Sequence, residues 1–176
     1  MQESSFTMFP ELSTERLQLR QITFDDKKAI FRLRSNKEIN EFLEREIPKN
    51  LNQAEGFIQT CLDAFENENS IFWALVSQNS NQLIGTVALN NIDTENSFAT
   101  IACEMNPDYQ DEGYMSEAMK VVLDYAIMSL NVSTIEASAH HNNEAAIALL
   151  EKFLFTVQTE REDTQSKDHR IYKFGS

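Results

Sequence analysis

The sequence contains few of the residues that interrupt or cross-link a folded chain. Its 176 residues include four Gly, three Pro and two Cys. Such a composition leaves little room for a flexible linker, so we expect one domain over residues 1–176, with 1–11 as a short N-terminal extension. Cys61 and Cys103 lie in apolar stretches without the spacing of metal ligands, which predicts two reduced core thiols and no metal site.

Long apolar runs and basic residues are also scarce. No run approaches the ~20 apolar residues of a membrane-spanning helix, and the first residues lack the pattern of a signal peptide, so we expect a cytoplasmic protein without membrane contacts. Fifteen Lys and Arg stand against 28 Asp and Glu, a formal net charge of −13. This charge argues against nucleic acid as a partner. It fits a cationic partner, such as an amine, a polyamine or a basic peptide, or it serves solubility alone.

The hydrophobic pattern alternates between the periods of strands and helices. The expected strands are 17–22, 71–76, 83–89, 98–105, 134–139, 155–159 and 170–174. The expected helices are 23–34, 53–65 (capped by Asn52), 113–130 and 143–153. This mixed order favours an α/β or α+β domain of three layers around one central sheet.

Several segments carry a family resemblance when they are taken together and in order. They read LSTERLQLR at 12–20, FWALV at 72–76, LIGT at 83–86, EMNPDYQ at 104–110, GYMSEA at 113–118, and NEA at 143–145 with LLEK at 149–152. Over residues 12–157 the chain resembles the RimJ/RimL-type enzymes of the GNAT acetyltransferase superfamily. The resemblance implies a mixed, mostly antiparallel sheet of seven strands flanked by about four helices. Its fourth and fifth strands, 98–105 and 134–139, would splay apart around acetyl-CoA.

The turn that follows strand 98–105 is the expected site for the CoA phosphates. A strand that turns into a helix presents unpaired N–H groups and the positive end of the helix dipole, and Gly113 allows close backbone approach. By resemblance, the cofactor-binding residues are Met105, Pro107, Gln110, Gly113, Tyr114, Met115, Ser116, Asn143 and Lys152. For Asn143 the alternative is a helix N-cap alone.

Glu104 is the candidate general base. An amine attacks a thioester only when it is neutral, and a carboxylate in a partly dry cleft can accept its proton. Glu104 ends its strand where the splay is expected, and partial burial should make it more basic; the alternative is a solvated glutamate. Cys103 lies on the opposite strand face, which argues against a cysteine nucleophile. We therefore expect direct acetyl transfer from acetyl-CoA to a primary amine, either a protein N-terminus or a small molecule.

Other polar residues carry weaker signals. His140 and His141 are adjacent, so in a strand they would point to opposite faces and could not share a metal. We expect them in a loop, with His140 as a candidate for the lining of the acceptor pocket. Glu117 and Asp124 are expected on a solvated helix face.

A few positions depart from the family pattern. Asp111 and Glu112 place two carboxylates beside the expected phosphate site. Ala146 and Leu150 stand where relatives carry a Ser or a Tyr proposed to protonate the leaving thiolate, and Leu154 replaces a usual Gly. These departures favour a second reading, a catalytically weak acyl-CoA-binding or regulatory protein; a non-enzymatic acidic adaptor is a third. A homodimer is expected from the family alone.

Overall fold

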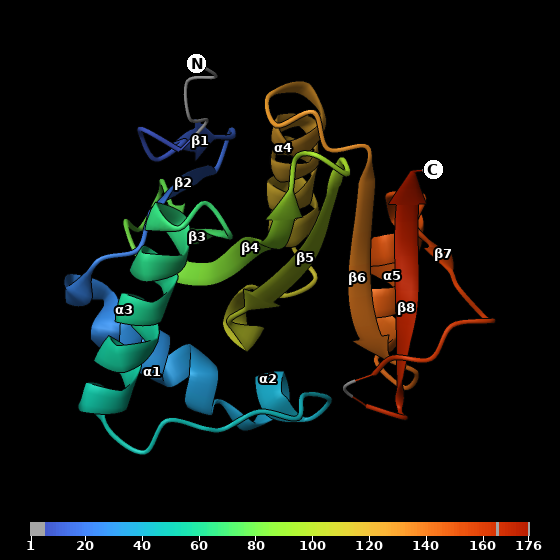
Figure 1. The fold of residues 1–176 in the computed structure, drawn as a ribbon. Helices are drawn as coiled ribbons and strands as arrows, with labels where there is room; N and C mark the ends of the chain where they lie inside the picture. Colours follow the sequence, from blue (N-terminus) through green and yellow to red (C-terminus); the bar gives the residue numbers. More distant parts are fainter. Residues whose placement is uncertain (1–5, 165, 176) are drawn as a thin grey trace.

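The computed structural model describes residues 6–164 and 166–175, so part of the predicted N-terminal extension, residues 1–5, lies outside it. Its centre is an eight-stranded sheet in the order β1-β2-β3-β4-β5-β6-β8-β7 (Figure 1). The strands are β1 Leu12–Ser13, β2 Leu17–Gln21, β3 Ile71–Ser77, β4 Leu83–Asp93, β5 Phe98–Met105, β6 Thr134–His140, β7 Thr156–Val157 and β8 His169–Gly175. The predicted fold is confirmed, with one strand more than expected because the two-residue β1 pairs with β2.

The described helices number five where about four were expected. They are α1 Lys27–Ser35, α2 Lys37–Asn40, α3 Leu51–Glu66, α4 Tyr114–Met128 and α5 Glu144–Lys152, with 3-10 turns at Phe24–Asp26 and Pro107–Tyr109. The additional helix is the four-residue α2, too short to leave a periodic pattern. The cap predicted at Asn52 is wrong, because α3 begins one residue earlier than that position and Asn50 Oδ1 accepts the Gln53 N–H at 2.9 Å. No described helix is both long and apolar enough to span a membrane.

The two faces of the sheet carry separate hydrophobic cores. Figure 1 shows α1 and α3 on one side of the sheet and α4 and α5 on the other. Alternate residues of β3 point to opposite faces, so Trp73 and Leu75 share one buried cluster with Val122 of α4. Phe72 instead packs against the second cluster, which includes Ile58 of α3.

One interruption in the sheet positions the site. Every neighbouring pair of strands is antiparallel except β5 and β6, which are parallel. Their pairing covers only Phe98–Thr100 against residues 134–136. Beyond it, β5 stays paired with β4 through Met105, and β6 with β8 through His140. The predicted splay is thereby confirmed, and the two strands diverge towards their carboxyl ends (Figure 1).

Helix α5 ends in a left-handed turn at a residue poorly suited to it. Leu154 has a φ of 67°, and the Phe155 N–H donates to the Leu150 carbonyl at 3.0 Å, which closes the helix end. The side chain of Leu154 is 77% exposed, so little packing compensates for its left-handed backbone conformation. A left-handed conformation costs a residue with a Cβ about 1–2 kcal/mol, whereas Gly adopts it readily.

We predict that Leu154→Gly stabilises the protein by about 1 kcal/mol, a rise in Tm of roughly 2–4 °C for a chain of this length. Leu154→Ala is the matched control, because it removes the same exposed side chain and keeps the Cβ. Thermal unfolding followed by circular dichroism measures both variants. A Tm for the Gly variant at or below that of the Ala variant would show that the turn is not strained.

Candidate active site

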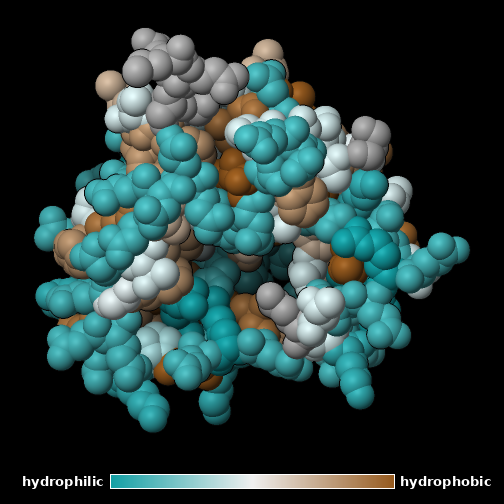
Figure 2. Space-filling model, viewed as in Figure 1, coloured by the Kyte–Doolittle hydropathy of each residue, from teal (hydrophilic) through white to brown (hydrophobic). Residues whose placement is uncertain are grey.

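A cleft of about 650 Å³ fills the space between the diverging strands. Its walls come from Thr100–Glu104 of β5, Glu136–His140 of β6, the first turns of α5, the segments 42–45 and 161–164, and residues Ser166 and His169. Figure 2 shows the hollow near the middle of this face, bordered mainly by hydrophilic residues. A second hollow of about 560 Å³ lies between α1 and the turn Pro107–Tyr109, away from the splay, and Pro107 is the only predicted site residue that lines it.

Glu104 lies in the cleft and is paired with a cation. Arg45, from the segment that joins α2 to α3, donates through Nη1 to Glu104 Oε1, and the two side chains are only 18% and 13% exposed. Arg45 Nε also donates to Asn40 Oδ1 at 2.8 Å. The solvated alternative for Glu104 is therefore wrong. The carboxylate thus enters the cleft already engaged by a guanidinium from another segment.

The turn after β5 brings several predicted cofactor residues together. Gln110 Nε2 donates to the Met105 carbonyl at 3.2 Å, which folds the turn back onto the strand end. Asp111 and Gly113 have φ values of 62° and 82°, and α4 begins directly after Gly113. The ring of Tyr114 lies 5.9 Å from that of Tyr109. The N-terminal N–H groups of α4 thus face a turn held close to β5, which fits the binding of an anion.

Glu117, in the first turn of α4, is part of a polar network and not of a solvated face, so that prediction is wrong. Thr14 Oγ1 donates to Glu117 Oε2, and Arg16 donates to the same carboxylate through Nε at 2.9 Å and through its backbone N at 3.2 Å. Burial alone would raise the pKa of Glu117, but the hydrogen bonds from Thr14 and Arg16 outweigh it and hold that pKa below its usual value. Asp124, by contrast, is exposed and pairs only with Lys120 at 3.2 Å, as expected of a solvated face.

Helix α5 contributes two more predicted residues. Lys152 Nζ donates to Ser116 Oγ at 3.1 Å, so both lie at the first turn of α4. Asn143 lines the cleft and also caps α5, because its Oδ1 accepts the Ala146 N–H at 3.2 Å. Both readings of Asn143 are thus compatible with its position. Met115 is half-buried against the larger core.

The comparisons with known proteins agree with this geometry. The family model for an acetyltransferase (GNAT) domain matches residues 16–156. The chain belongs to the GNAT acetyltransferase family. It is similar to the N-acetyltransferase YoaA of Bacillus subtilis strain 168, at 34% identity over 84% of each chain.

Two solved structures share the fold. The ribosomal-protein-S5-alanine acetyltransferase of Vibrio fischeri matches with a TM-score of 0.78 and 19% identity, over 94% of this chain and 96% of that one. RimL, an alpha-N-protein acetyltransferase in complex with coenzyme A, matches with a TM-score of 0.80 and 17% identity, over 94% and 98%. The predicted membership of the GNAT superfamily is confirmed, and the chain shares the fold of RimL. The chain is an acetyltransferase, and acetyl-CoA is its cosubstrate.

The residues present in this acetyltransferase fit such a cosubstrate. Past Thr100, the facing edges of β5 and β6 have no strand partner within residues 6–164 and 166–175. Unpaired backbone groups at a strand edge can pair with an extended chain that carries amides, as the pantetheine arm of CoA does. The open edge and the helix N-terminus that follows it therefore offer separate places for the arm and the phosphates.

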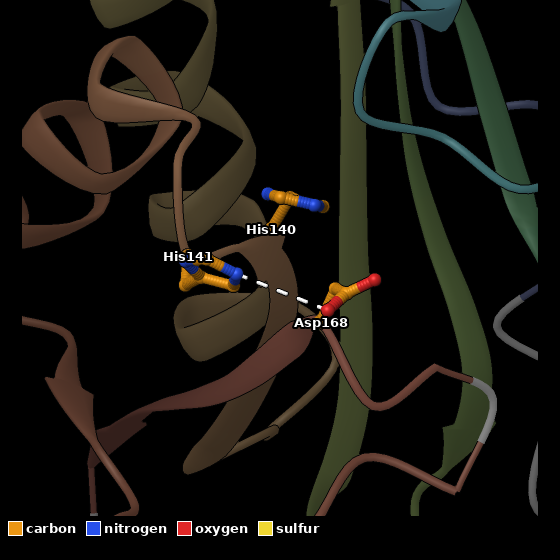
Figure 3. Close-up of side chains that lie close together, drawn as sticks. All are labelled: His140, His141 and Asp168. Carbon is orange, nitrogen blue, oxygen red and sulfur yellow. Dashed lines mark ion pairs between the residues drawn. The ribbon is translucent and has the colours of Figure 1, made fainter.

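Both histidines were expected in a loop, which is confirmed for His141 and wrong for His140, the last residue of β6. β6 ends at His140 and the chain turns at His141, so the two rings stack with centroids 4.7 Å apart, and His141 Nε2 lies 3.9 Å from Asp168 Oδ1 (Figure 3). Contrary to the expectation that the two histidines could not share a metal, one ligand atom from each of His140, His141 and Asp168 lies within 4.8 Å of the others. His140 Nδ1 accepts the Asn142 N–H at 3.0 Å, a bond that a cation on that nitrogen would displace. His140 does line the cleft, as expected of an acceptor-pocket residue.

Cys103 is exposed in the cleft and is not the core thiol that we predicted. Its strand has lost the cover of β6 by this point, although protein atoms still surround the thiol closely. Desolvation, with a smaller contribution from the charge of Glu104, raises the pKa of Cys103 to about 12. Cys61 in α3 is half-buried, and burial raises its pKa to about 12 as well. Neither thiol is a ready nucleophile at neutral pH.

We predict that iodoacetamide alkylates Cys103 in the folded acetyltransferase at pH 7.5 about a hundredfold or more slowly than in the urea-unfolded chain, where the thiol regains its ordinary pKa. The folded rate should rise about tenfold per pH unit between pH 8 and 11, because the thiolate fraction does. Peptide mapping by mass spectrometry separates Cys103 from Cys61. Equal rates in the folded and unfolded chains at pH 7.5 would contradict the raised pKa.

Proposed function

We propose that this enzyme transfers acetyl from acetyl-CoA directly to a primary amine in the cleft between β5 and β6, with Glu104 as the general base. The observation that carries the proposal is the place of Glu104, the penultimate residue of β5, which is a shielded carboxylate inside the cleft. A protein N-terminus or a small amine would serve as the acceptor. The former gains support from the names of RimL and the Vibrio fischeri protein, which describe protein acetylation.

The proposed cosubstrate site runs from the open edge of β5 to the first turn of α4. Met105, Gln110 and Gly113 would lie along the turn, and Ser116 with Lys152 beyond it. The predicted contacts of Pro107, Tyr114, Met115 and Asn143 stay part of the proposal. When bound, acetyl-CoA supplies the thioester that the amine attacks.

The Glu104 carboxylate and the Arg45 guanidinium paired with it decide how the amine loses its proton. An ammonium that enters the cleft competes with Arg45 for Glu104, and the carboxylate then takes one proton from it. The neutral nitrogen bonds to the carbonyl carbon, the carbon–sulfur bond breaks, and CoA leaves as a thiolate. The nitrogen gives its second surplus proton to water, so that the product is a neutral amide. Ala146 and Leu150 line the cleft without a titratable group, so neither position supplies a proton to the leaving sulfur. A thiol with a pKa of about 8.5 can leave as the anion.

The second candidate function is acyl-CoA binding with little catalysis, as in a regulatory protein. The ion pair between Arg45 and Glu104 favours it, because Arg45 occupies the carboxylate that would act as the base. The two candidates differ in a direct measurement. An enzyme releases free thiol from acetyl-CoA when amines or peptides are added, whereas a binding protein retains CoA without turnover.

We predict that Glu104→Gln lowers kcat by ~10²-fold or more and leaves the Kd of CoA nearly unchanged, since the amide keeps the shape of the side chain and loses the base. Thiol release and calorimetry measure the two quantities. Glu95→Gln, an exposed change of the same charge in the turn between β4 and β5, is the matched control. Wild-type turnover in Glu104→Gln across pH 6–9 would remove Glu104 from the mechanism. CoA binding by the wild type without turnover on any amine would favour the binding protein.

A further inference from the structure

The turn that is proposed to bind the CoA phosphates is acidic. Residues 107–113 read PDYQDEG, with three carboxylates and no Lys or Arg. CoA carries a pyrophosphate and a 3′-phosphate, so the side chains of the turn oppose binding. Any cation beside these phosphates must come from a segment elsewhere in the chain.

Arg16 comes from the segment before β2 and lies directly against this turn. Its Nη1 donates to the Glu112 carbonyl at 3.0 Å, and its guanidinium carbon lies 4.0 Å from the centre of the Tyr114 ring. Its Nη2 lies on the Gly113 side, where a Cβ added to that glycine would come within 3.4 Å of it. The guanidinium therefore borders the residue at which the backbone is most open to a phosphate.

The guanidinium of Arg16 is held in place and still has donors to offer. Nε is fixed on Glu117 at 2.9 Å, and the stacked Tyr114 ring restricts the plane of the group. Within the described part of the chain, Nη2 makes no hydrogen bond, and the side chain is 39% exposed. A guanidinium fixed by two of its nitrogens keeps a third free for a phosphate oxygen without further loss of side-chain entropy.

We propose that Arg16 is a phosphate-binding residue of the acetyl-CoA site, donating from Nη2 to a phosphate oxygen beside Gly113. This inference rests on the proposed cosubstrate site. Arg16 supplies the cation that the acidic turn lacks, and Lys152 reaches the same first turn of α4 through Ser116. Glu117 acts as a positioning residue, because it orients the guanidinium without reaching the phosphates itself.

A purely structural role for Arg16 is the competing explanation, since the same contacts tie the turn to β2. The two roles separate with an acyl donor that lacks phosphates. S-Acetylpantetheine carries the thioester and the pantetheine arm alone. A damaged turn or fold impairs the use of both donors, whereas a lost phosphate contact impairs only acetyl-CoA.

The experiment compares kcat/KM for acetyl-CoA and for S-acetylpantetheine in the wild type, Arg16→Gln and Lys120→Gln. Lys120 lies on the exposed face of α4, so its variant removes one positive charge, as Arg16→Gln does, but away from the turn. We expect Arg16→Gln to lower kcat/KM for acetyl-CoA about tenfold or more, the scale of a charge-assisted hydrogen bond, and to leave S-acetylpantetheine unchanged. Lys120→Gln should change neither value.

Equal losses with both donors, or no loss with acetyl-CoA, would overturn the role of Arg16. If Arg16→Gln does not fold, Arg16→Lys takes its place, because it keeps the charge but loses the fixed fork. The lysine variant should lose efficiency with acetyl-CoA only, and an equal loss with both donors would again overturn the proposal. Failure of the proposed function has a different signature, since the wild type itself would then release thiol from neither donor.

Discussion

The early end of the pairing between β5 and β6 is the constraint on which the site depends. After Thr100 the two strands separate, yet each keeps a full partner on its other side, β4 for β5 and β8 for β6. The sheet can therefore open without unravelling. The opening leaves backbone groups unpaired along two facing edges, uncovers Cys103 and sets Glu104 in a shielded cleft. A continuous sheet would have none of these features.

Two long-range arginine contacts complete the site around this opening. Arg16 reaches Glu117 across 101 residues of sequence, and Arg45 reaches Glu104 across 59. Both arginines come from segments that precede β3, whereas both carboxylates lie in the β5–α4 unit. The N-terminal part of the chain thus holds the proposed cosubstrate turn through Arg16 and covers the proposed base through Arg45. This division suits an enzyme whose acceptor must displace an internal cation before it reacts.

Local patterns in the sequence predicted much of this arrangement. The alternation of side chains between the two faces over residues 98–105 predicted the observed bounds of β5. The order of the family motifs predicted the splay between β5 and β6. Cys103 was misplaced because alternation assumes a neighbour on both edges of a strand, and that neighbour leaves at Thr100. His140 was wrongly expected in a loop because the strand extends one residue beyond the predicted 134–139. Nothing in the sequence around Arg45 indicates its contact with Glu104. Arg16 lies within the family motif at 12–20, but its ion-pair partner, Glu117, is distant in the sequence.

Hydrogen exchange of the β5 amides in the presence and absence of CoA tests the central claim most directly. If the open edge of β5 receives the pantetheine arm, those amides of residues 101–105 that point to this edge, and not to β4, should gain protection when CoA binds. The amides of the turn 110–116 should gain protection with them. The amides of β2 and β3, which are already paired, should change little. Binding of CoA that leaves residues 101–105 unprotected would contradict the account, because the gap between β5 and β6 would then not be the cosubstrate site.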